Sequence, residues 1–580
     1  MREHEDKKAT QDGSALLYSE DRESDIRSRL AHVLDDFKAQ RSAPITGGYS
    51  LTERDSILIT YGDMVSETGI PPLATLHDFL VVHLDGIVSA VHLLPFFPYS
   101  SDDGFAVIDY RRVDPQFGTW DDIRQLRLRF RLMFDAVINH VSAQSKWFQD
   151  FLRGDPAYQD WFIVVEDQPD LSQVTRPRAL PLLTHFDTPF GGKAVWTTFS
   201  ADQIDLNYRN PDVLLEVIDT LLFYVSQGAE FIRLDAIAYL WKEIGTSCIH
   251  LPQTHRIIQL LRLVLNEAAP HVKLITETNV PHQDNVSYLG DGCNEAQLVY
   301  NFALPPLVMH TLRTGDARAI SKWAASLSLP SDRVCFFNFL ASHDGIGLNP
   351  ARGILTDTDI DALVEQAFAH GGHVSYKHNS DGSQSAYELN INYFDALSDP
   401  AGREPLTTQV DRFIAAQAIM LALAGLPGIY FHSLFGSRGW PEGVMLTGQK
   451  RAINRQKLDR IELERELSDP SSLRRIVFDR YCHLLKARAS SSTFHPYGSQ
   501  RVIDCGKSVF AVLRSSPTGD DQVLCLHNIS DKPQAVRLSD RHASLTDLLT
   551  QQTWRNVQSI ELAPYQARWL RTEEGHGSRV

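Results

Sequence analysis

The sequence predicts an α/β fold, a closed (β/α)8 TIM barrel, and two observations lead to that expectation. First, eight short runs of β-forming residues follow one another, and most of them alternate with helical patterns. Strand-helix alternation is typical of parallel βαβ units, and eight such units close into a barrel. Second, the chain of 580 residues is long enough for a barrel of about 250 residues with further domains. The runs are Ile57–Gly62, Ala90–Phe96, Arg131–Asn139, Glu230–Ala236, Lys273–Thr278, Gln297–Phe302, Val334–Ala341 and Gly428–Ser433.

Three of these runs lead into an acidic residue, namely Asp235, Glu277 and Asp344. A minimal barrel allots roughly 31 residues to each βα unit. The first two acids lie about one unit apart and the last two about two units apart. The spacing therefore predicts that they follow the fourth, fifth and seventh strands. In a TIM barrel that edge carries the active site.

The regions outside the alternation predict additional domains. Residues 1–50 form a polar extension with one amphipathic helix, which we interpret as a packing element or an oligomer contact. An inserted subdomain is expected over 141–205, after strand 3, and an active-site loop subdomain over 345–397, after strand 7. Alternating apolar residues predict an antiparallel β domain over 491–572. The barrel itself is expected over 51–140, 206–344 and 398–490. The amphipathic helix predicted within residues 1–50 has its apolar residues on one face, namely Ile26, Leu30, Val33, Leu34 and Phe37.

Composition excludes several classes of protein. A net charge of −16 disfavours nucleic acid as a partner, because binding a polyanion usually needs a basic face. The six cysteines are scattered without a C-x-x-C pair, which indicates reduced thiols, and we expect a cytoplasmic protein. The apolar stretch Phe413–Phe431 is divided by Gly425 and Pro427, so it predicts a helix and a strand and no membrane span. No spacing calls for a metal or another cofactor.

Carboxylates in this arrangement suit the cleavage of glycosidic bonds. Retaining transfer needs two carboxyl groups roughly 5 Å apart, one acting as nucleophile and one protonating the leaving oxygen. A single acid after a strand more often caps the next helix, and His140 alone would more often be a core or loop residue. Three acids in this order after strands favour an active site over helix caps. Arg233 and His343 lie next to these acids in sequence and can tune them.

Several motifs carry a resemblance to a known family. Asp135-Ala-Val-Ile-Asn-His140, Arg233-Leu-Asp235, Glu277 and His343-Asp344 resemble the four signature regions of the α-amylase family of retaining glycosidases and transglycosylases. The resemblance spans about residues 55 to 490 and is closest to sucrose phosphorylase and its relatives. The supporting motifs are Pro95–Phe105, Arg176–Pro181, Val195–Asp205, Arg233–Glu243 and Arg451–Arg455.

The resemblance implies a role for each of the matching residues. Asp235 is implied to be the nucleophile, Glu277 the general acid and base, and Asp344 a ligand of the sugar hydroxyls that binds more tightly in the transition state. Arg233 is implied to keep Asp235 ionised. The remaining implied sugar contacts are Asp103 and Arg455, which close the far side of the glucose pocket, the apolar walls Phe105 and Phe199, and the polar residues His140, Gln203 and His343.

The acceptor side of the resemblance implies phosphorolysis to α-glucose 1-phosphate. Arg178 and Tyr387 match phosphate-side positions of sucrose phosphorylases, and Tyr239 matches an acceptor-site tyrosine. Glu388 stands where the sucrose enzymes have glutamine, so the chain is more similar to the glucosylglycerate phosphorylase branch. The implied glucoside is 2-O-α-glucosylglycerate, with inorganic phosphate as co-substrate. Cations proposed for the anionic glycerate are Lys377, Arg178 and Arg352.

Other functions remain open from the sequence. A sucrose phosphorylase, a small-substrate α-glucoside hydrolase and a transglucosidase would all keep the same three acids. A non-catalytic amylase-like interaction protein would be expected to have lost them, and a glucan-degrading amylase is disfavoured by the closed pocket. The sequence does not determine the acceptor or the oligomeric state, and a homo-oligomer is compatible with it.

Overall fold

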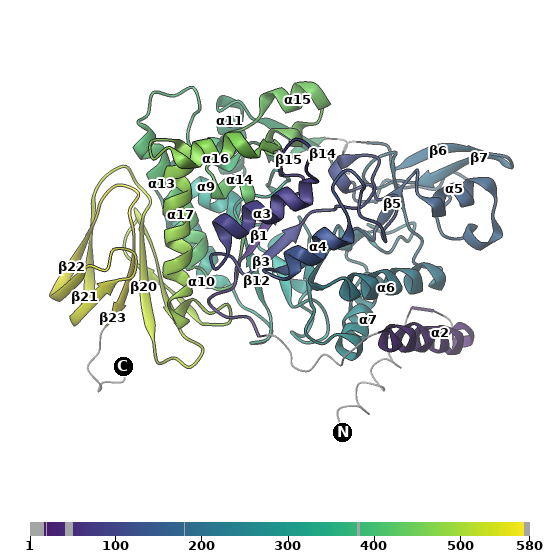
Figure 1. Cartoon of the computed structure of the whole chain (residues 1–580), viewed down its shortest axis with the longest axis horizontal. Helices are drawn as coiled ribbons and strands as arrows, with labels where there is room; N and C mark the ends of the chain where they lie inside the picture. Colours follow the sequence, from purple (N-terminus) through teal and green to yellow (C-terminus); the bar gives the residue numbers. More distant parts are fainter. Residues whose placement is uncertain (1–16, 19, 41–49, 179, 380–382, 573–580) are drawn as a thin grey trace.

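A computed structural model describes residues 17–18, 20–40, 50–178, 180–379 and 383–572 (Figure 1). Its centre is a closed barrel of eight parallel strands, and each strand overlaps one of the predicted runs. The predicted fold class is therefore confirmed. In chain order the strands are β1 (Ile57–Thr60), β3 (Ala90–Leu93), β4 (Arg131–Ala136), β9 (Ala229–Leu234), β10 (Lys273–Thr276), β11 (Leu298–Tyr300), β12 (Cys335–Asn338) and β16 (Leu426–Tyr430).

The barrel closes between its first and last strands. Ile57 on β1 pairs in parallel with Ala90 on β3 and with Gly428 on β16. All four residues of β1 and of β3 are buried. Parallel strands covered on both faces read as continuous apolar runs, which is why β-propensity identified them in the sequence.

Helices surround the barrel and cover its outer face (Figure 1). Local signals set their ends: Thr119 and Asp122 form a capping box before α4, and the Asn210 side chain caps α6. Within the described part of the chain, no helix is long and apolar enough to cross a membrane. The helices are α3 (Pro72–Leu84), α4 (Trp120–Arg127), α6 (Pro211–Ser226), α7 (Pro252–Ala268), α8 (His282–Ser287), α9 (Leu304–Thr314), α10 (Arg318–Ser326), α13 (Leu406–Ala422) and α17 (Leu473–Ala489).

The segment between β4 and α6 forms two small antiparallel pairs around a short helix. One pair joins β5 to β8, and the other joins β6 to β7. These elements lie at one end of the molecule in Figure 1. They are β5 (His140–Ser142), α5 (Lys146–Arg153), β6 (Leu183–Thr188), β7 (Gly191–Trp196) and β8 (Gln203–Asp205).

The segment after β12 is more regular than the predicted loop. It contains a 13-residue helix, α11 (Asp357–Ala369), and a three-stranded antiparallel sheet. The sheet consists of β13 (Ile346–Gly347), β14 (His373–His378) and β15 (Gln384–Asn390), and α12 (Tyr393–Leu397) follows it. Along β15, Glu388 pairs with Ser375 and Ala386 with Tyr376, so the residue between them is an extra residue in a β-bulge.

The chain after β16 completes the rim and then leaves the barrel. The rim contains α14 (Phe431–Leu434), α15 (Pro441–Thr447), the 3-10 helix η5 (Lys450–Asn454) and α16 (Arg460–Ser468), and β17 (Leu458–Asp459) pairs with β2 (Val65–Ser66). The predicted C-terminal antiparallel domain is confirmed as one six-stranded sheet. The residue limits assigned to the domains stay predictions. The sheet contains β18 (Gln500–Asp504), β19 (Val509–Ser515), β20 (Gln522–Asn528), β21 (Gln534–Asp547), β22 (Thr553–Leu562) and β23 (Ala567–Thr572).

The predicted N-terminal helix is present as α2 (Glu20–Ala39), and it packs on α6 and α7 of the same chain. Its apolar face is buried there, with Leu34 only 5% exposed. An ion pair between Lys38 Nζ and Glu267 Oε1, at 2.6 Å, holds its C-terminal end against α7. Of the two interpretations offered for the helix, packing within the chain is the one observed. The remainder of residues 1–50 lies mostly outside the described residues.

Leu34→Ala is expected to lower the free energy of unfolding by about 2–4 kcal/mol, because it leaves a cavity between α2 and the barrel helices. Thermal unfolding should show a lower midpoint while turnover stays unchanged. Val82→Ala provides the control, since Val82 is 68% exposed and little apolar contact is lost. Equal midpoints for the two variants would contradict the packing described here.

Candidate active site

A cavity of about 520 Å³ opens at the carboxyl-terminal edge of the barrel. It is lined by all three predicted acids, Asp235, Glu277 and Asp344. Asp235 directly follows β9, Glu277 directly follows β10, and Asp344 lies in the loop after β12. Parallel strands direct these residues to one edge, so acids far apart in the sequence meet. The other predicted residues that line the cavity are Phe105, His140, Arg178, Phe199, Gln203, Tyr239, His343, Tyr387 and Glu388.

Arg233, on β9, lies beneath two of the acids and does not itself line the cavity. Its Nη1 donates to Asp235 Oδ1 at 2.8 Å, while its Nη2 is 4.0 Å from Glu277 Oε2. It also pairs with Asp135 on β4. The side chain is 2% exposed, so its charge acts in a desolvated environment where electrostatic interactions are strong.

The two carboxyl groups above Arg233 titrate as a pair. Burial raises the pKa of Asp235 and of Glu277, and Arg233 opposes the rise in both cases. The charge of Asp344 adds to the increase at Glu277. Between the two, the direct hydrogen bond from Arg233 favours the ionised form at Asp235. Glu277 instead accepts a backbone hydrogen bond, from the Ala236 amide at 3.2 Å, so the two carboxyl groups lie in unequal environments.

Asp344 has the opposite electrostatic environment. Its burial alone would raise its pKa, but the Arg451 guanidinium, together with Arg455, holds the pKa well below the usual range. Arg451 Nη1 lies 2.6 Å from Asp344 Oδ1, and Arg455 Nη2 lies 3.6 Å from the same oxygen. An ionised carboxylate therefore lines the same cavity as the two carboxyl groups whose pKa values are raised.

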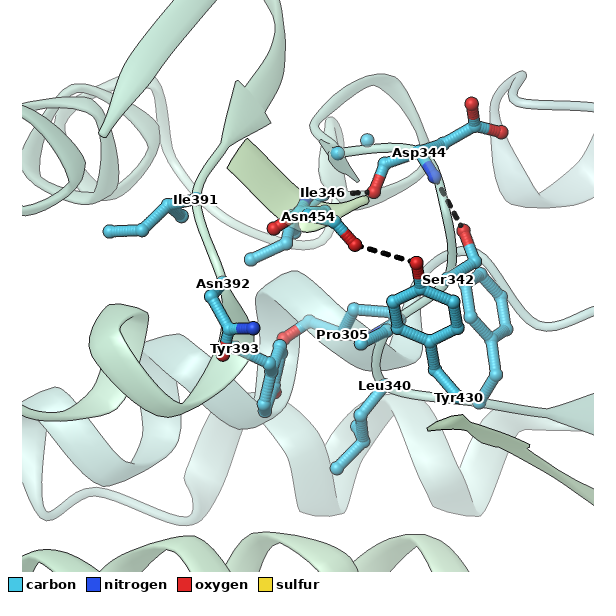
Figure 2. Close-up of a pocket in the computed structure, with 14 residues that line it drawn as sticks. Pro305, Leu340, Ser342, Asp344, Ile346, Ile391, Asn392, Tyr393, Tyr430 and Asn454 are labelled. Carbon is cyan, nitrogen blue, oxygen red and sulfur yellow. Dashed lines mark hydrogen bonds between the residues drawn. The ribbon is translucent and has the colours of Figure 1, made fainter. Parts of the chain in front are cut away.

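The backbone of the Asp344 loop is fixed from below (Figure 2). The Asp344 amide donates to Ser342 Oγ at 3.2 Å, and Asn454 Nδ2 donates to the Asp344 carbonyl at 3.1 Å. The Tyr430 hydroxyl in turn donates to the Asn454 carbonyl at 2.6 Å. In Figure 2 the Asp344 carboxylate points away from these groups. The backbone of the loop is thus anchored by these bonds, while the Asp344 carboxylate lines the cavity.

Aromatic and imidazole rings form one side of the cavity. Phe105 stacks on His343 with ring centroids 4.8 Å apart, and Phe199 meets the Tyr239 ring edge-on at 5.4 Å. His140 Nε2 lies 2.9 Å from the Phe105 carbonyl oxygen. Burial lowers the pKa of His140 to about 4 and that of His343 to about 3, so both rings are neutral at pH 7. Neutral rings can hydrogen-bond hydroxyl groups without adding charge.

The structure separates the two neighbouring aspartates before Gly104. Asp103 makes the expected contact with Arg455, at 2.8 Å from Nη1, but neither of these residues lines the cavity. Asp102 lines it instead and accepts from Arg178 Nη2 at 2.9 Å. Both aspartates have positive φ, 54° and 48°, which is uncommon for a residue other than glycine. Asp102 is thus a cavity residue that the family resemblance did not single out.

Some of the residues predicted for the acceptor side line the cavity and others do not. Arg178, Tyr387 and Glu388 line the cavity, whereas Lys377 and Arg352 do not. Arg352 is directed toward its own segment, donating to the Ala386 carbonyl at 3.2 Å. Two cations of η5 that the sequence did not single out, Lys450 and Arg451, line the cavity. The motif Arg451–Arg455 was the signal that could have identified Arg451.

Comparisons with known proteins show the family of the chain. The catalytic domain of the alpha-amylase family matches residues 84–344. The chain belongs to that family. Glucosylglycerate phosphorylase of Allomeiothermus silvanus is 53% identical over 96% of this chain and 97% of its own, and that of Escherichia coli is 46% identical over 90% and 92%. Sucrose phosphorylase of Bifidobacterium adolescentis is 30% identical over 71% and 82%.

Solved structures show the same relationship in three dimensions. The crystal structure of sucrose 6F-phosphate phosphorylase from Thermoanaerobacter thermosaccharolyticum superposes with a TM-score of 0.71 at 27% identity, covering 83% of this chain and 95% of that one. An alpha-amylase from H. orenii shares the fold, with a TM-score of 0.68 at 18% identity over 90% of this chain and all of that one.

Proposed function

We propose that this protein is a retaining glycoside phosphorylase, which transfers a glucosyl unit from a small α-glucoside to phosphate and releases α-glucose 1-phosphate. The observation that carries the proposal is one cavity that joins Asp235 and Glu277, above a shared arginine, to an acceptor-side cation, Arg178. The two acids can act as nucleophile and as general acid and base in a double displacement, and the cation can bind an anionic acceptor.

In the first step, an Asp235 oxygen attacks the anomeric carbon while Glu277 gives its proton to the glycosidic oxygen. The bond from that carbon to the leaving oxygen breaks, and a β-glucosyl ester of Asp235 forms. In the second step, a phosphate oxygen attacks the same carbon, Glu277 takes up the proton, and the ester bond breaks. Two inversions give net retention. Asp344 binds hydroxyl groups of the ring and stabilises the positive charge that develops on it.

The sugar side of the cavity suits a single glucosyl unit. Arg455 pairs with Asp103 and its Nη1 lies 3.5 Å from Asp102 Oδ1, so the pair supports the wall that Asp102 forms. Phe105 and His343 form a flat wall. Neutral His140 and the Gln203 amide also line this side, and their Nε2 atoms lie 3.1 Å apart. These groups form the sugar-binding set in our proposal, with Arg233 as the residue that keeps Asp235 charged.

The glucoside we propose is 2-O-α-glucosylglycerate. The names of the relatives that are 46–53% identical over most of the chain support this choice over sucrose. Glycerate is an anion, and Arg178 and Lys450 are cavity cations that can meet its carboxylate. Tyr239 and Tyr387 complete the acceptor side. We also propose a cytoplasmic location, supported by the six cysteines, all of which are free.

The experiment that tests the proposal compares initial rates of α-glucose 1-phosphate release from glucosylglycerate and from sucrose, with and without phosphate. We expect product only with phosphate, and faster release from glucosylglycerate. Faster turnover of sucrose would make the protein a sucrose phosphorylase. Sugar release that ignores phosphate would replace phosphorolysis by hydrolysis.

Arg178→Gln is expected to weaken phosphate-dependent turnover about 10- to 100-fold, because a charge-assisted hydrogen bond contributes roughly 1.5–3 kcal/mol. The loss should appear as a higher KM for phosphate, while hydrolysis of the glucosyl donor persists. Arg153→Gln is the matched control, since Arg153 lies on α5 and does not line the cavity. An unchanged KM for phosphate would remove Arg178 from the acceptor site.

A further inference from the structure

Glu388 lines the cavity, yet both of its carboxylate oxygens are already occupied. Oε1 accepts from Arg451 Nε at 2.9 Å and from the Gly345 amide at 3.1 Å, and Oε2 accepts from Arg451 Nη2 at 2.6 Å. The residue is 1% exposed. An acceptor molecule would have to displace a buried, bidentate ion pair in order to reach it. Glu388 is therefore poorly placed for the acceptor contact that the sequence suggested.

Arg451 connects Glu388 to the sugar side of the cavity. Two of its nitrogens bind Glu388, and the third, Nη1, lies 2.6 Å from Asp344 Oδ1. The guanidinium is rigid and planar, so two parallel bonds to one carboxylate fix the direction of the remaining nitrogen. The orientation of Arg451 toward Asp344 is thus set by Glu388.

The rest of η5 anchors the same loop. Asn454 donates to the Asp344 carbonyl at 3.1 Å, and Arg455, directly after η5, donates from Nε to the His343 carbonyl at 2.9 Å. From β15, Glu388 accepts from the Gly345 amide at 3.1 Å. A Cβ on Gly345 would lie 2.6 Å from Glu388 Cγ, so glycine is needed for this close approach. The Glu388 carboxylate on β15 thus binds both the loop at Gly345 and η5 at Arg451.

We propose that Glu388 is a positioning residue which holds Arg451 against Asp344 and so governs every glucosyl transfer, whichever acceptor is used. This inference rests on the proposed function only in taking Asp344 as a ligand of the sugar. A glutamine at this position offers one oxygen and no charge. It would bind Arg451 at a single point, so Asp344 would lose the fixed orientation of its partner.

Two reactions separate this role from an acceptor contact. Phosphorolysis of glucosylglycerate uses the acceptor side, whereas hydrolysis of α-glucosyl fluoride uses only the sugar side and water. We expect Glu388→Gln to lower kcat/KM of both reactions by a similar factor, roughly 10- to 100-fold, as occurs when a partner that orients a ligand group is removed. A loss confined to phosphorolysis, with α-glucosyl fluoride hydrolysis unchanged, would overturn the proposal.

A double-mutant cycle tests the route through Arg451. In an Arg451→Met background, Glu388→Gln should cause less than a 3-fold further loss, because the connecting group is gone. Additive losses would mean that Glu388 acts by another route. Glu404→Gln is the matched control: it removes half of a similar Glu–Arg pair, with Arg412, outside the cavity, and it should leave both rates unchanged.

The unfolding midpoint of each variant shows whether fold loss contributes. A midpoint within a few degrees of wild type together with equal rate losses supports the positioning role. Equal losses that follow the midpoint, and that vanish when the assay is cooled, would contradict it. If the wild-type protein hydrolysed α-glucosyl fluoride but never consumed phosphate, the proposed function would fail while this comparison would still decide the role of Glu388.

Discussion

Asp235→Asn is expected to lower turnover of the glucoside by roughly 10⁴-fold or more, because the amide cannot form the glucosyl ester. The variant keeps the size of the side chain, and the oxygen of the introduced amide can still accept from Arg233. Loss of stability should therefore be small. Steady-state release of α-glucose 1-phosphate measures the effect. Asp411→Asn is the matched control, because Asp411 pairs with Arg480 away from the cavity and should be silent.

A shortened side chain gives a sharper version of this test. In Asp235→Gly, azide can enter the space of the missing carboxylate and attack the anomeric carbon directly. A single displacement inverts the centre, so α-glucosyl fluoride with azide should give β-glucosyl azide. Wild-type protein should give products of the α configuration. An α product from the variant, or full activity of Asp235→Asn, would assign the nucleophile to another residue.

Glu277→Gln is expected to lower turnover of glucosides about 10²- to 10⁴-fold, the range for loss of a general acid and base. The first step on α-glucosyl fluoride should be affected much less, since fluoride leaves without a proton. The size of the loss should therefore increase with the pKa of the leaving group. Equal losses for all leaving groups would exclude Glu277 as the proton donor.

The pH dependence follows from the same assignment. Burial and the Asp344 charge raise the pKa of Glu277, so its acid form is present below that pKa and is lost as the pH rises through it. We expect kcat/KM of wild-type protein to fall on the alkaline side for this reason. In Glu277→Gln the alkaline fall should disappear while the acidic fall, from protonation of Asp235, remains. An alkaline fall that survives in the variant would belong to another group.

The fold could be predicted from the sequence because its determinants are local. Each barrel strand is a buried run of β-forming residues, and β1 and β3 are apolar enough to be recognised singly. The acids at the strand ends were predictable for the same reason, since topology places the ends of parallel strands on one edge. Asp235, Glu277 and Asp344 needed only their position after a strand.

The site residues that were missed depend on contacts between distant segments. Asp102 and Asp103 are adjacent and chemically identical, both have positive φ, and only the first is among the residues that line the cavity. Arg451 reaches Asp344 because η5 folds back over the barrel edge. Lys377 is on β14 and directly follows Ser375 and Tyr376, which line the cavity, but Lys377 itself does not line it. No spacing rule contains this information.

The segment 345–397 is more regular than its composition indicates. Its glycine, asparagine and serine residues are typical of loops, yet Thr356 and Asp359 form a capping box that begins α11. That signal is visible in the sequence as a threonine three residues before an aspartate. Capping chemistry therefore indicates this helix where composition alone indicates a loop.

The β-bulge on β15 makes the residues that line the cavity depend on the length of the hairpin formed by β14 and β15. Consecutive residues of a regular strand face opposite sides of the sheet, so Tyr387 and Glu388 would normally not share one surface. The unpaired residue at the bulge is Tyr387, and both side chains line the same cavity. Removing one amino acid from this hairpin would restore ordinary alternation and withdraw one of the two groups. Insertions and deletions here would thus alter the cavity wall as effectively as replacing one of these side chains.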